Sequence, residues 1–423
     1  MERGQRNSIF SDIDWFTILL YLLLITLGWL NIYSAVYNEN HHAITDMTQK
    51  YGKQLLWIGT SLIIALIILV IDEKFYTAFS YLIYALFLIA CIAVPYLGRE
   101  VKGSRSWFRF GDFGVQPAEF MKFATNLAIA KFLSNQFIKI TDYRNTLITL
   151  IIIGVPFIVI KVLEDETGLA LVFSAFVFCL YREGLSVNYL LIGFIAVVLF
   201  FLALAVNNLY LFIIISSICL IAMLFIKRTA KNIFTIVLVG MFACGIVKGA
   251  STFYNHLEQH QKVRIDVLLG NGSVNIKKEG YNVNQSKIAI GSGGMFGKGY
   301  LEGTQTKYDF VPAADTDFIF CTIGEEWGFL GSTIVILLEL TLITRVVLMA
   351  ERQRSAFSRI YGYGVASVLF FHLMINVGMT IGLAPVIGIP LPFFSYGGSS
   401  LWSFTILLFI FIKLDSHRLE ILR

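Results

Sequence analysis

The residue of this chain best placed to do chemistry is an aspartate at the boundary between a polar loop and an apolar helix. Asp317 follows a segment that is rich in glycine from Gly291 onward, which permits a close approach of the backbone to a ligand, and it directly precedes the apolar run FIFCTIG. A carboxylate at a membrane–water boundary can accept a proton as a general base, although it can also serve as a simple interfacial anchor. Two deeper glutamates, Glu325 and Glu326, weaken the anchor interpretation, because carboxylates inside a membrane are costly. We expect these glutamates to pair with cations and hold the helices together.

A second group of polar residues surrounds the start of a predicted helix at residue 116. Glu119 and Lys122 are three residues apart and therefore share a helix face. They could form a mutual ion pair or take part in catalysis, and the spacing does not decide between the two. Trp107 could be an interfacial residue or a stacking platform for a sugar.

Two short polar segments are predicted to lie on the outer face of the membrane. The segment 97–115 carries Arg105 and Arg109, although outer loops usually lack basic residues. This departure indicates an anionic partner on that face, which is either a substrate or lipid headgroups. The segment EDETG at 164–168 is a solvated turn, a divalent-cation site or a partner for these arginines.

A third polar stretch lies between residues 376 and 400. It contains three of the seven prolines, and Gly397 and Gly398 precede the last apolar run. Non-helical backbone near a membrane is tolerated where it is buried in protein or lines a cavity. We expect a re-entrant or cavity-lining loop on the outer face.

The elements that must position these residues are membrane-spanning helices. The chain has 423 residues, of which 57% are hydrophobic and 14% are charged. Apolar runs of roughly 18 or more residues recur along it, which excludes a soluble protein of this size. We expect an all-α polytopic membrane protein that forms a single domain over residues 1–423. The twelve predicted spans are 15–36, 55–72, 76–96, 116–135, 145–163, 167–181, 187–206, 209–226, 233–250, 317–343, 358–382 and 399–414.

The distribution of lysine and arginine predicts the orientation of these spans. Basic residues gather at 227–231, at 351–354 and in the tail from Lys413. Cytoplasmic loops collect such residues, so we place both termini in the cytoplasm. The large loop at 251–316 then lies outside the membrane, and it begins with a polar stretch typical of an interfacial helix.

Together these stretches resemble the SEDS family (shape, elongation, division and sporulation proteins), and its RodA-like members more than its FtsW-like members. The resemblance covers most of the chain. It rests on the segments SRSWFRFGDFGVQPAEFMKFA, NQSKIAIGSGGMFGKGYLEGTQ, FVPAADTDFIFCTIGEEWGFLG and GLAPVIGIPLPFFSYGGSS, in this order. It implies a core of ten spans, to which a pair near 209–250 has been added.

The resemblance further implies a peptidoglycan glycosyltransferase. Such an enzyme polymerises lipid II on the outer face of the bacterial cytoplasmic membrane, in cell elongation and shape maintenance. The family's essential acid falls on Asp317, which we expect to be the general base. The predicted substrate-binding residues are Arg105, Trp107, Arg109, Gln116, Glu119, Lys122, Gln261, Arg264, Lys298 and Thr304.

The resemblance also implies partners. These are a class B penicillin-binding protein that supplies transpeptidase activity, lipid II, undecaprenyl pyrophosphate and the surrounding membrane lipids. The leaving pyrophosphate needs stabilisation by basic residues or by a divalent cation such as Mg²⁺ or Mn²⁺, whose ligands the sequence leaves unknown. We expect no organic cofactor and no nucleic-acid partner. The chain departs from the family at Ala313, Asn275, Glu166 and Ala118, which puts roles for the loop acids in doubt.

Two other functions compete with polymerisation. A lipid II flippase or other transporter should have its polar site near the bilayer midplane, often between inverted repeats. Here the polar residues lie toward the outer face and no repeat is visible. A non-catalytic scaffold for a penicillin-binding protein is the third possibility, and it would tolerate replacement of Asp317.

Overall fold

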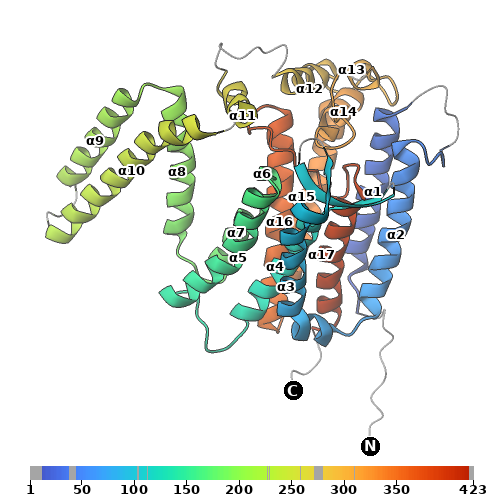
Figure 1. Ribbon diagram of the computed structural model, residues 1–423, viewed down its shortest axis with the longest axis horizontal. Helices are drawn as coiled ribbons and strands as arrows, with labels where there is room; N and C mark the ends of the chain where they lie inside the picture. Colours follow the sequence, from blue (N-terminus) through green and yellow to red (C-terminus); the bar gives the residue numbers. More distant parts are fainter. Residues whose placement is uncertain are drawn as a thin grey trace, which may run out of the picture. The chain divides into compact units, whose positions relative to one another are not determined.

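The computed structural model describes residues 12–37, 44–101, 104–111, 113–225, 227, 229–257, 259–270, 280–308 and 310–418. The chain forms two compact units: unit 1 comprises Met1–Leu185 and Asn282–Arg423, and unit 2 comprises Ser186–Tyr281. The elements before unit 2 (Figure 1) are α1 (Trp15–Ala35), α2 (Lys50–Val70), α3 (Glu73–Leu97), β1 (Arg99–Val101), β2 (Ser104–Phe110), β3 (Phe113–Val115), α4 (Pro117–Leu133), α5 (Tyr143–Leu163), α6 (Thr167–Val172), the 3-10 helix η1 (Phe173–Ala175) and α7 (Phe176–Arg182). Those that follow are α8 (Val187–Ala205), α9 (Asn208–Phe225), α10 (Ala230–His256), α11 (Gln259–Leu269), α12 (Tyr281–Ser292), α13 (Thr304–Lys307), α14 (Ile319–Glu326), α15 (Gly328–Glu351), α16 (Ala356–Thr380) and α17 (Gly398–Ser416).

Within the described residues, ten helices are long and apolar enough to cross a membrane, which confirms the polytopic all-α prediction. They are α1, α2, α3, α5, α8, α9, α10, α15, α16 and α17. The predicted span 116–135 is α4, which has 17 residues and contains two buried charges. The predicted span 167–181 is divided among α6, η1 and α7.

The predicted span 317–343 is also interrupted. The short helix α14 ends at Glu326, and α15 begins at Gly328, whose φ of +66° suits glycine. The predicted continuous helix was wrong here, because this glycine turns the backbone. Asp317 therefore belongs to a turn that precedes α14, which is itself shorter than a span.

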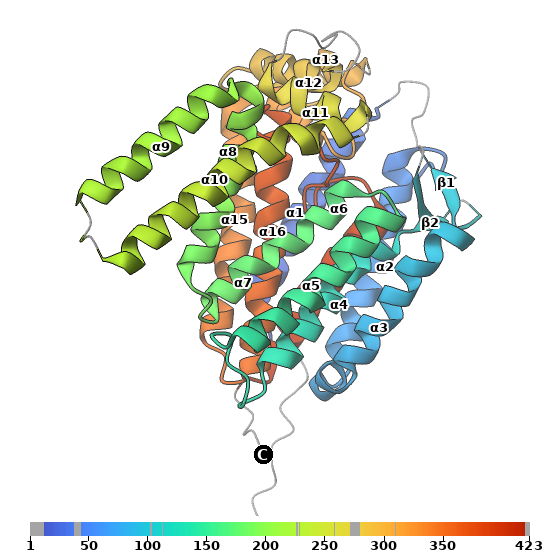
Figure 2. The same ribbon diagram turned by 60° about the vertical axis from the view of Figure 1, so that its left-hand side comes forward.

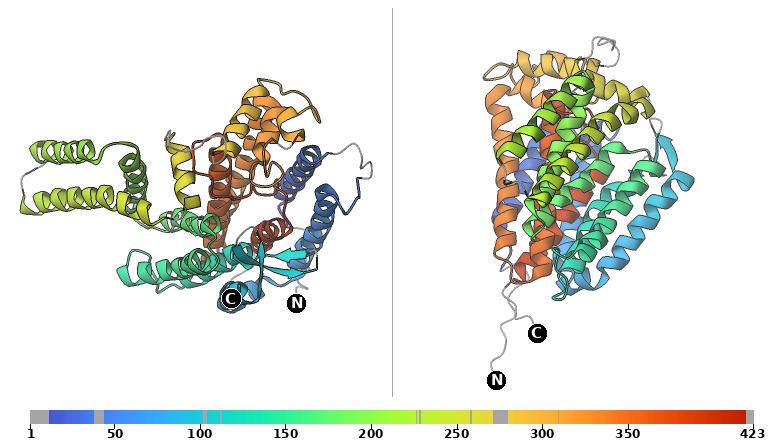
Figure 3. Two further views of the ribbon diagram at one scale, coloured as in Figure 1. Left: turned by 45° about the horizontal axis from the view of Figure 1, so that its top comes forward. Right: turned by 90° about the vertical axis from the view of Figure 1, so that its left-hand side faces the viewer.

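The interior of unit 1 is built around α4, α16 and α17. In α16 and α17, 78% of the most apolar window is buried inside the protein, against 17% in α3. Figures 1 and 3 show α16 and α17, in red tones, among the other helices of this unit. These inner helices carry most of the polar residues discussed below.

The first and last helices of unit 1 are joined at one end. Asp14 caps α1 by accepting from the backbone N–H of Thr17 at 3.0 Å. Arg352 contacts Asp14 at 3.2 Å and also donates from Nε to Asp415 of α17 at 3.0 Å. Arg345 pairs with Asp14 as well. The start of α1 and the end of α17 therefore lie side by side.

A small antiparallel sheet of order β1-β2-β3 connects α3 to α4. Arg99 pairs with Trp107, and Phe108 pairs with Val115. Figure 2 shows β1 and β2 at one end of α3. The described residues of the predicted outer segment 97–115 thus form this sheet, in which β2 and β3 make a hairpin.

Unit 2 contains α8 to α11. Its apolar contacts gather in one small cluster, formed by Ala203, Leu211, Ile215, Val247 and Ala250. Helices α9 and α10 pack closely at Gly240, where a Cβ would lie 2.8 Å from Cys219 Sγ. The predicted outer loop 251–316 is largely helical, since it contains α11, α12 and α13.

Candidate functional site

Asp317 lies in the turn that leads into α14, with its side chain only partly buried. The side chain of Asn376 on α16 donates to the Asp317 carbonyl at 2.8 Å. The Asp317 carboxylate itself lies beside Gly388, where a Cβ would be 3.3 Å from Asp317 Oδ2. The Asp317 carboxylate is therefore held against a second backbone segment.

That second segment is the proline-rich stretch 385–397, and the prediction that it is non-helical is confirmed. Ser395 joins it to the Asp317 turn by donating from Oγ to the carbonyl of Thr316 at 2.7 Å. A second bond runs from the backbone N–H of Tyr396 to the carbonyl of Asp315 at 2.9 Å. The loop thus forms one wall of the Asp317 site.

The acidic turn at 164–168 packs against the same loop. A Cβ at Gly168 would lie 2.0 Å from the carbonyl oxygen of Ile387, so only glycine permits this approach. Glu166 accepts a hydrogen bond from Ser106 Oγ of β2 at 2.9 Å. The structure therefore brings the Asp317 turn, the proline-rich loop, the acidic turn and the β2 strand together.

Glu119 and Lys122 form the ion pair that their spacing allows. Lys122 Nζ lies 2.6 Å from Glu119 Oε2, and both residues are buried. The ammonium group also lies 4.1 Å from the centre of the Phe404 ring and 3.4 Å from His372 Nε2. A buried pair with this many contacts is held in one geometry. A role in binding substrate stays a prediction for both residues.

Glu325 clamps the glycine-rich loop onto α14. One carboxylate oxygen accepts from Lys298 Nζ at 2.7 Å and from the Gln305 N–H at 2.9 Å. The other accepts from the N–H and the hydroxyl of Thr306, both at 3.0 Å. Thr304 Oγ1 lies 2.8 Å from Lys298 Nζ. The prediction that the deeper glutamates pair with cations is confirmed for Glu325.

The glycines of this loop approach α14 itself. A Cβ at Gly293 or Gly297 would lie 2.0 Å from a carbonyl oxygen of Gly324 or Glu326. The sequence predicts a close approach of this backbone to a ligand. In the structure the close approach at these two positions is to the protein's own helix end.

The pKa values of Glu325 and Glu326 shift in opposite directions, because hydrogen bonds prevail at Glu325 and burial prevails at Glu326. Burial opposes the ionisation of Glu325, but hydrogen bonds from Gln305, Lys298 and Thr306 outweigh it and lower its pKa. Burial raises the pKa of Glu326 to about 7. Ser34 of α1 donates to Glu326, which fixes α1 beside α14.

The hairpin residues have different environments. Arg105 and Arg109 are exposed on β2. The Trp107 ring packs on the backbone of β3, because a Cβ at Gly114 would lie 2.9 Å from it. Gln116 is buried before α4, and its N–H donates to Ser399 Oγ at 3.2 Å.

The remaining residues singled out from the sequence lie on α11, outside the described residues, or in the Asp317 turn itself. Gln261 and Arg264 lie on α11 of unit 2. Asn275 lies outside the described residues. Ala313 adopts a φ of +61°, and its carbonyl accepts from the N–H of Phe318 at 3.1 Å in the turn that carries Asp317. The departure at Ala313 therefore lies in the turn of the candidate base.

Sequence reasoning missed His372 and Asn376 on α16. Both are fully buried, and both bind the carbonyls of the proline-rich loop. A signal for them was present, because they and Thr380 recur at intervals of four in an apolar span and so share one helix face.

The described residues contain no cluster of three or more histidine, cysteine, aspartate or glutamate side chains that could hold a metal ion. The acidic turn 164–168 therefore does not offer a cage made of protein ligands alone. Its Glu164 is buried beside Cys91, and burial raises the pKa of this carboxyl to about 8. The expected divalent cation stays a prediction, and no step of the reaction is routed through it below.

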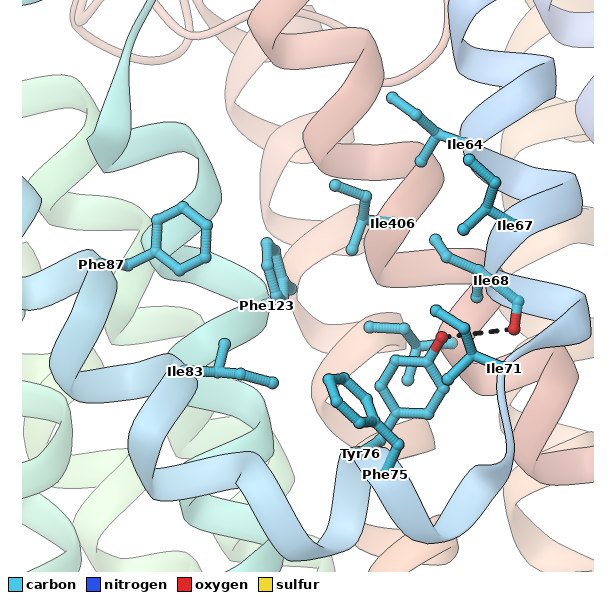
Figure 4. A pocket seen from close by; sticks show the side chains of 11 residues that line it. Ile64, Ile67, Ile68, Ile71, Phe75, Tyr76, Ile83, Phe87, Phe123 and Ile406 are labelled. Carbon is cyan, nitrogen blue, oxygen red and sulfur yellow. Dashed lines mark hydrogen bonds between the residues drawn. The ribbon is translucent and has the colours of Figure 1, made fainter.

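An apolar groove opens among α2, α3, α4 and α17, with a volume of about 240 Å³ (Figure 4). Figure 4 shows isoleucine and aromatic side chains facing it, and the only dashed bond joins Tyr76 to the Ile68 carbonyl. The groove lies near the turn between α2 and α3, which contributes Ile71 and Phe75. Phe123 of α4 also lines it.

Comparisons with known proteins give a consistent picture. The FtsW/RodA/SpoVE family, described as a cell cycle protein, matches residues 14–212 and 192–420. The chain is 30% identical to the peptidoglycan glycosyltransferase RodA of Treponema pallidum, covering 97% of this chain and 99% of that one. It is 31% identical to the peptidoglycan glycosyltransferase MrdB of Escherichia coli K12, covering 94% and 93%.

Two solved structures share the fold. One belongs to work on the structural coordination of polymerization and crosslinking by a peptidoglycan synthase complex, with a TM-score of 0.68 and 22% identity. The other is the rod shape determining protein RodA of Thermus thermophilus, with a TM-score of 0.62 and 24% identity. In both cases the match covers 97% of this chain and 99% of the other.

Proposed function

Because the chain belongs to the FtsW/RodA/SpoVE family, we propose that it polymerises lipid II with Asp317 as the general base. The chain is a multi-pass membrane protein and a peptidoglycan glycosyltransferase of cell elongation. The family, the fold and the activity expected from the sequence are thereby confirmed. The substrate, the residues and the orientation given below are proposals.

The reaction joins two lipid-linked sugars. Asp317 accepts the proton from the 4-hydroxyl of the GlcNAc of one lipid II molecule. The resulting oxygen attacks the anomeric carbon of MurNAc at the end of the growing chain. The bond from this carbon to undecaprenyl pyrophosphate breaks, the pyrophosphate leaves with the electron pair, and the centre inverts from α to β. Proton transfer to a positioned base of this kind contributes about 10²–10⁴-fold in rate.

The observation that carries this proposal is the position of the Asp317 carboxylate. It is only partly buried, and it lies where the proline-rich loop and the turn before α14 meet. A base must be accessible to its substrate and held in one place, and this junction supplies both conditions. The two deeper glutamates are buried and bound by other groups, so they are weaker candidates.

The leaving pyrophosphate needs positive charge nearby. Lys122 and Lys298 are already paired with the carboxylates of Glu119 and Glu325. The exposed side chains of Arg105 and Arg109 on β2 are better placed to bind a large anion. Their exposure favours the interpretation of the basic outer segment as a substrate contact.

The prenyl tail of the substrate would lie between helices. The groove lined by Phe123 is wholly apolar and suits a chain of isoprene units. We therefore place the tail beside α4. Both termini are proposed to be cytoplasmic, which agrees with the start of α1 and the end of α17 lying at the same end of unit 1.

The proposed partner is a class B penicillin-binding protein. One solved structure with the same fold belongs to a peptidoglycan synthase complex that coordinates polymerization and crosslinking. A polymerase whose product is crosslinked by a second protein would need such a complex.

The test is polymerisation of labelled lipid II by purified protein, alone and with its penicillin-binding partner. Asp317→Ala should slow the formation of glycan strands by about 10²–10⁴-fold, since the base is absent. Asp315→Asn is the matched control, because Asp315 lies two residues away but is buried and paired with Lys50 at 2.8 Å. Strands made by Asp317→Ala at the wild-type rate would disprove the assignment of the base.

Two further results would favour the competing functions. Movement of lipid II across vesicles without polymer would favour transport. Full support of the partner's activity by Asp317→Ala would favour a scaffold.

A further inference from the structure

We propose that Asn376 is a positioning residue for polymerisation, which places the Asp317 carboxylate by holding two backbone segments with one side-chain amide. This inference rests on the proposed role of Asp317 as base. Asn376 is fully buried on α16. Its Nδ2 donates to the carbonyl of Asp317 at 2.8 Å and to the carbonyl of Ile389 at 2.8 Å. An amide nitrogen carries two hydrogens, so each segment receives one.

The two segments held by Asn376 are those that define where the carboxylate lies. One bond fixes the backbone of the base residue itself. The other fixes the residue after Gly388, whose Cα faces Asp317 Oδ2 so closely that a Cβ would lie 3.3 Å from it. Loss of the amide would release both segments at once. The carboxylate would then shift relative to the loop that forms its wall.

His372 anchors the same loop one helical turn earlier. Its Nδ1 lies 3.0 Å from the carbonyl oxygen of Pro390, and its Nε2 lies 3.4 Å from Lys122 Nζ. A carbonyl only accepts and an ammonium only donates, so Nδ1 carries the hydrogen and Nε2 accepts from Lys122. Two adjacent loop residues, Ile389 and Pro390, are therefore tied to one face of α16.

A buried asparagine often does no more than satisfy a nearby carbonyl, and this chain contains such a case. Asn126 of α4 is also fully buried, and its Nδ2 donates to the carbonyl of Tyr361 on α16 at 2.9 Å. In both residues Oδ1 is buried without a hydrogen-bond partner. The difference is the group that each one holds. Only Asn376 binds the residue that carries the base, which makes Asn126 a matched control.

The experiment compares Asn376→Ala with Asn126→Ala. Lipid II polymerisation is measured per folded molecule, together with KM and the thermal midpoint. Both variants should lose thermal stability, and Asn376→Ala should lose more, because Asn376 donates two hydrogen bonds and Asn126 donates one. Asn376→Ala should lower kcat by about 100-fold, the cost of a misplacement of about 1 Å, with KM for lipid II unchanged. Asn126→Ala should keep the wild-type kcat.

Two additional variants make the result specific. Asn376→Leu keeps the approximate size of the side chain but removes its donors, so it should show the same loss in kcat even where the alanine variant folds poorly. In an Asp317→Glu background the carboxylate is already displaced, so Asn376→Ala should cost much less than it does in the wild type. This dependence on the base would not arise from a merely structural role.

The inference is overturned if Asn376→Ala and Asn126→Ala have the same kcat, or if the effects of Asn376→Ala and Asp317→Glu simply multiply. Asp317→Ala is measured alongside them. If that variant is active, the proposed function fails as well. If it is inactive while Asn376→Ala is fully active, only the positioning role is lost.

Discussion

Replacement of Glu325 by glutamine tests whether one buried carboxylate holds the glycine-rich loop in place. Its two oxygens accept from Lys298, Gln305 and Thr306 at 2.7–3.0 Å. Glutamine keeps one acceptor oxygen and has an NH₂ donor group in place of the other. Either the donors of Lys298 and Gln305 or those of Thr306 must then face this NH₂ group. Hydrogen bonds to a charged group contribute about 1.5–3 kcal/mol each, and removing one partner of a buried pair costs about 3–5 kcal/mol. We therefore expect a local loss of about 3–5 kcal/mol.

The loss should be confined to the loop, because stability is not uniform across a structure. Amide hydrogen exchange at Gln305 and Thr306 should accelerate by roughly 10²–10⁴-fold, at about tenfold per 1.4 kcal/mol, while α16 keeps its protection. Glu302→Gln is the control, since Glu302 is exposed in the same loop and should change exchange little. Unchanged exchange at Gln305 and Thr306 in Glu325→Gln would refute the clamp.

Acidification should release the glycine-rich loop of the wild-type protein in the same way. The pKa of Glu325 is lowered from 4.5, so its contribution is present above that value and is lost as the pH falls through the lower folded pKa. Exchange at the two loop amides should therefore rise only below about pH 4.5, and a rise near neutral pH would contradict the assignment of charge.

Three further changes have defined outcomes. Lys122→Met leaves Glu119 buried without its cation and should destabilise the protein by about 3–5 kcal/mol in thermal or denaturant unfolding. The double variant Lys122→Met with Glu119→Leu should recover most of this stability. Equal losses in the single and double variants would contradict the pairing. Gly388→Ala and Gly184→Ala both place a side chain at positive φ (+69° and +108°), and each should lower the stability of the protein by about 1–2 kcal/mol. Only Gly388→Ala adds a methyl group beside the proposed base, so only this variant should slow polymerisation. Equal polymerisation rates in the two variants would argue against that contact. Burial raises the pKa of Glu164 to about 8, so the folded protein holds a proton that the unfolded chain releases. The thermal midpoint should therefore fall as the pH rises from about 4.5 through about 8. Glu164→Gln should abolish this pH dependence of the thermal midpoint, and an unchanged dependence would assign it to another group.

The sequence was most informative where polarity changes abruptly. The position of Asp317 at a junction, the non-helical proline-rich loop and the pairing of Glu325 with a cation follow from charge, proline and hydropathy. The Glu119–Lys122 pair follows from helical spacing. These patterns are local, which is why they can be interpreted without a structure.

The features that the sequence did not predict depend on contacts between distant segments. A glycine shows that close approach is allowed but does not show to what, so Gly293 was assigned to a ligand although it packs on α14. The break at Gly328 is a single residue inside an apolar run. His372 and Asn376 have partners in the loop that follows their own helix, and only the folded chain shows that Asn376 also binds the Asp317 backbone.

The contact between Lys122 and Phe404 has a consequence for biosynthesis. Lys122 belongs to α4, whereas Phe404 belongs to α17, which is translated well after α4. The nascent chain must therefore insert a charged pair into the membrane before the aromatic ring that covers it has been translated. A charge in lipid is costly. We infer that the intermediate keeps α4 near the insertion machinery or beside water until α17 arrives, so that a ribosome stalled before α17 would leave this helix exposed to quality-control proteases.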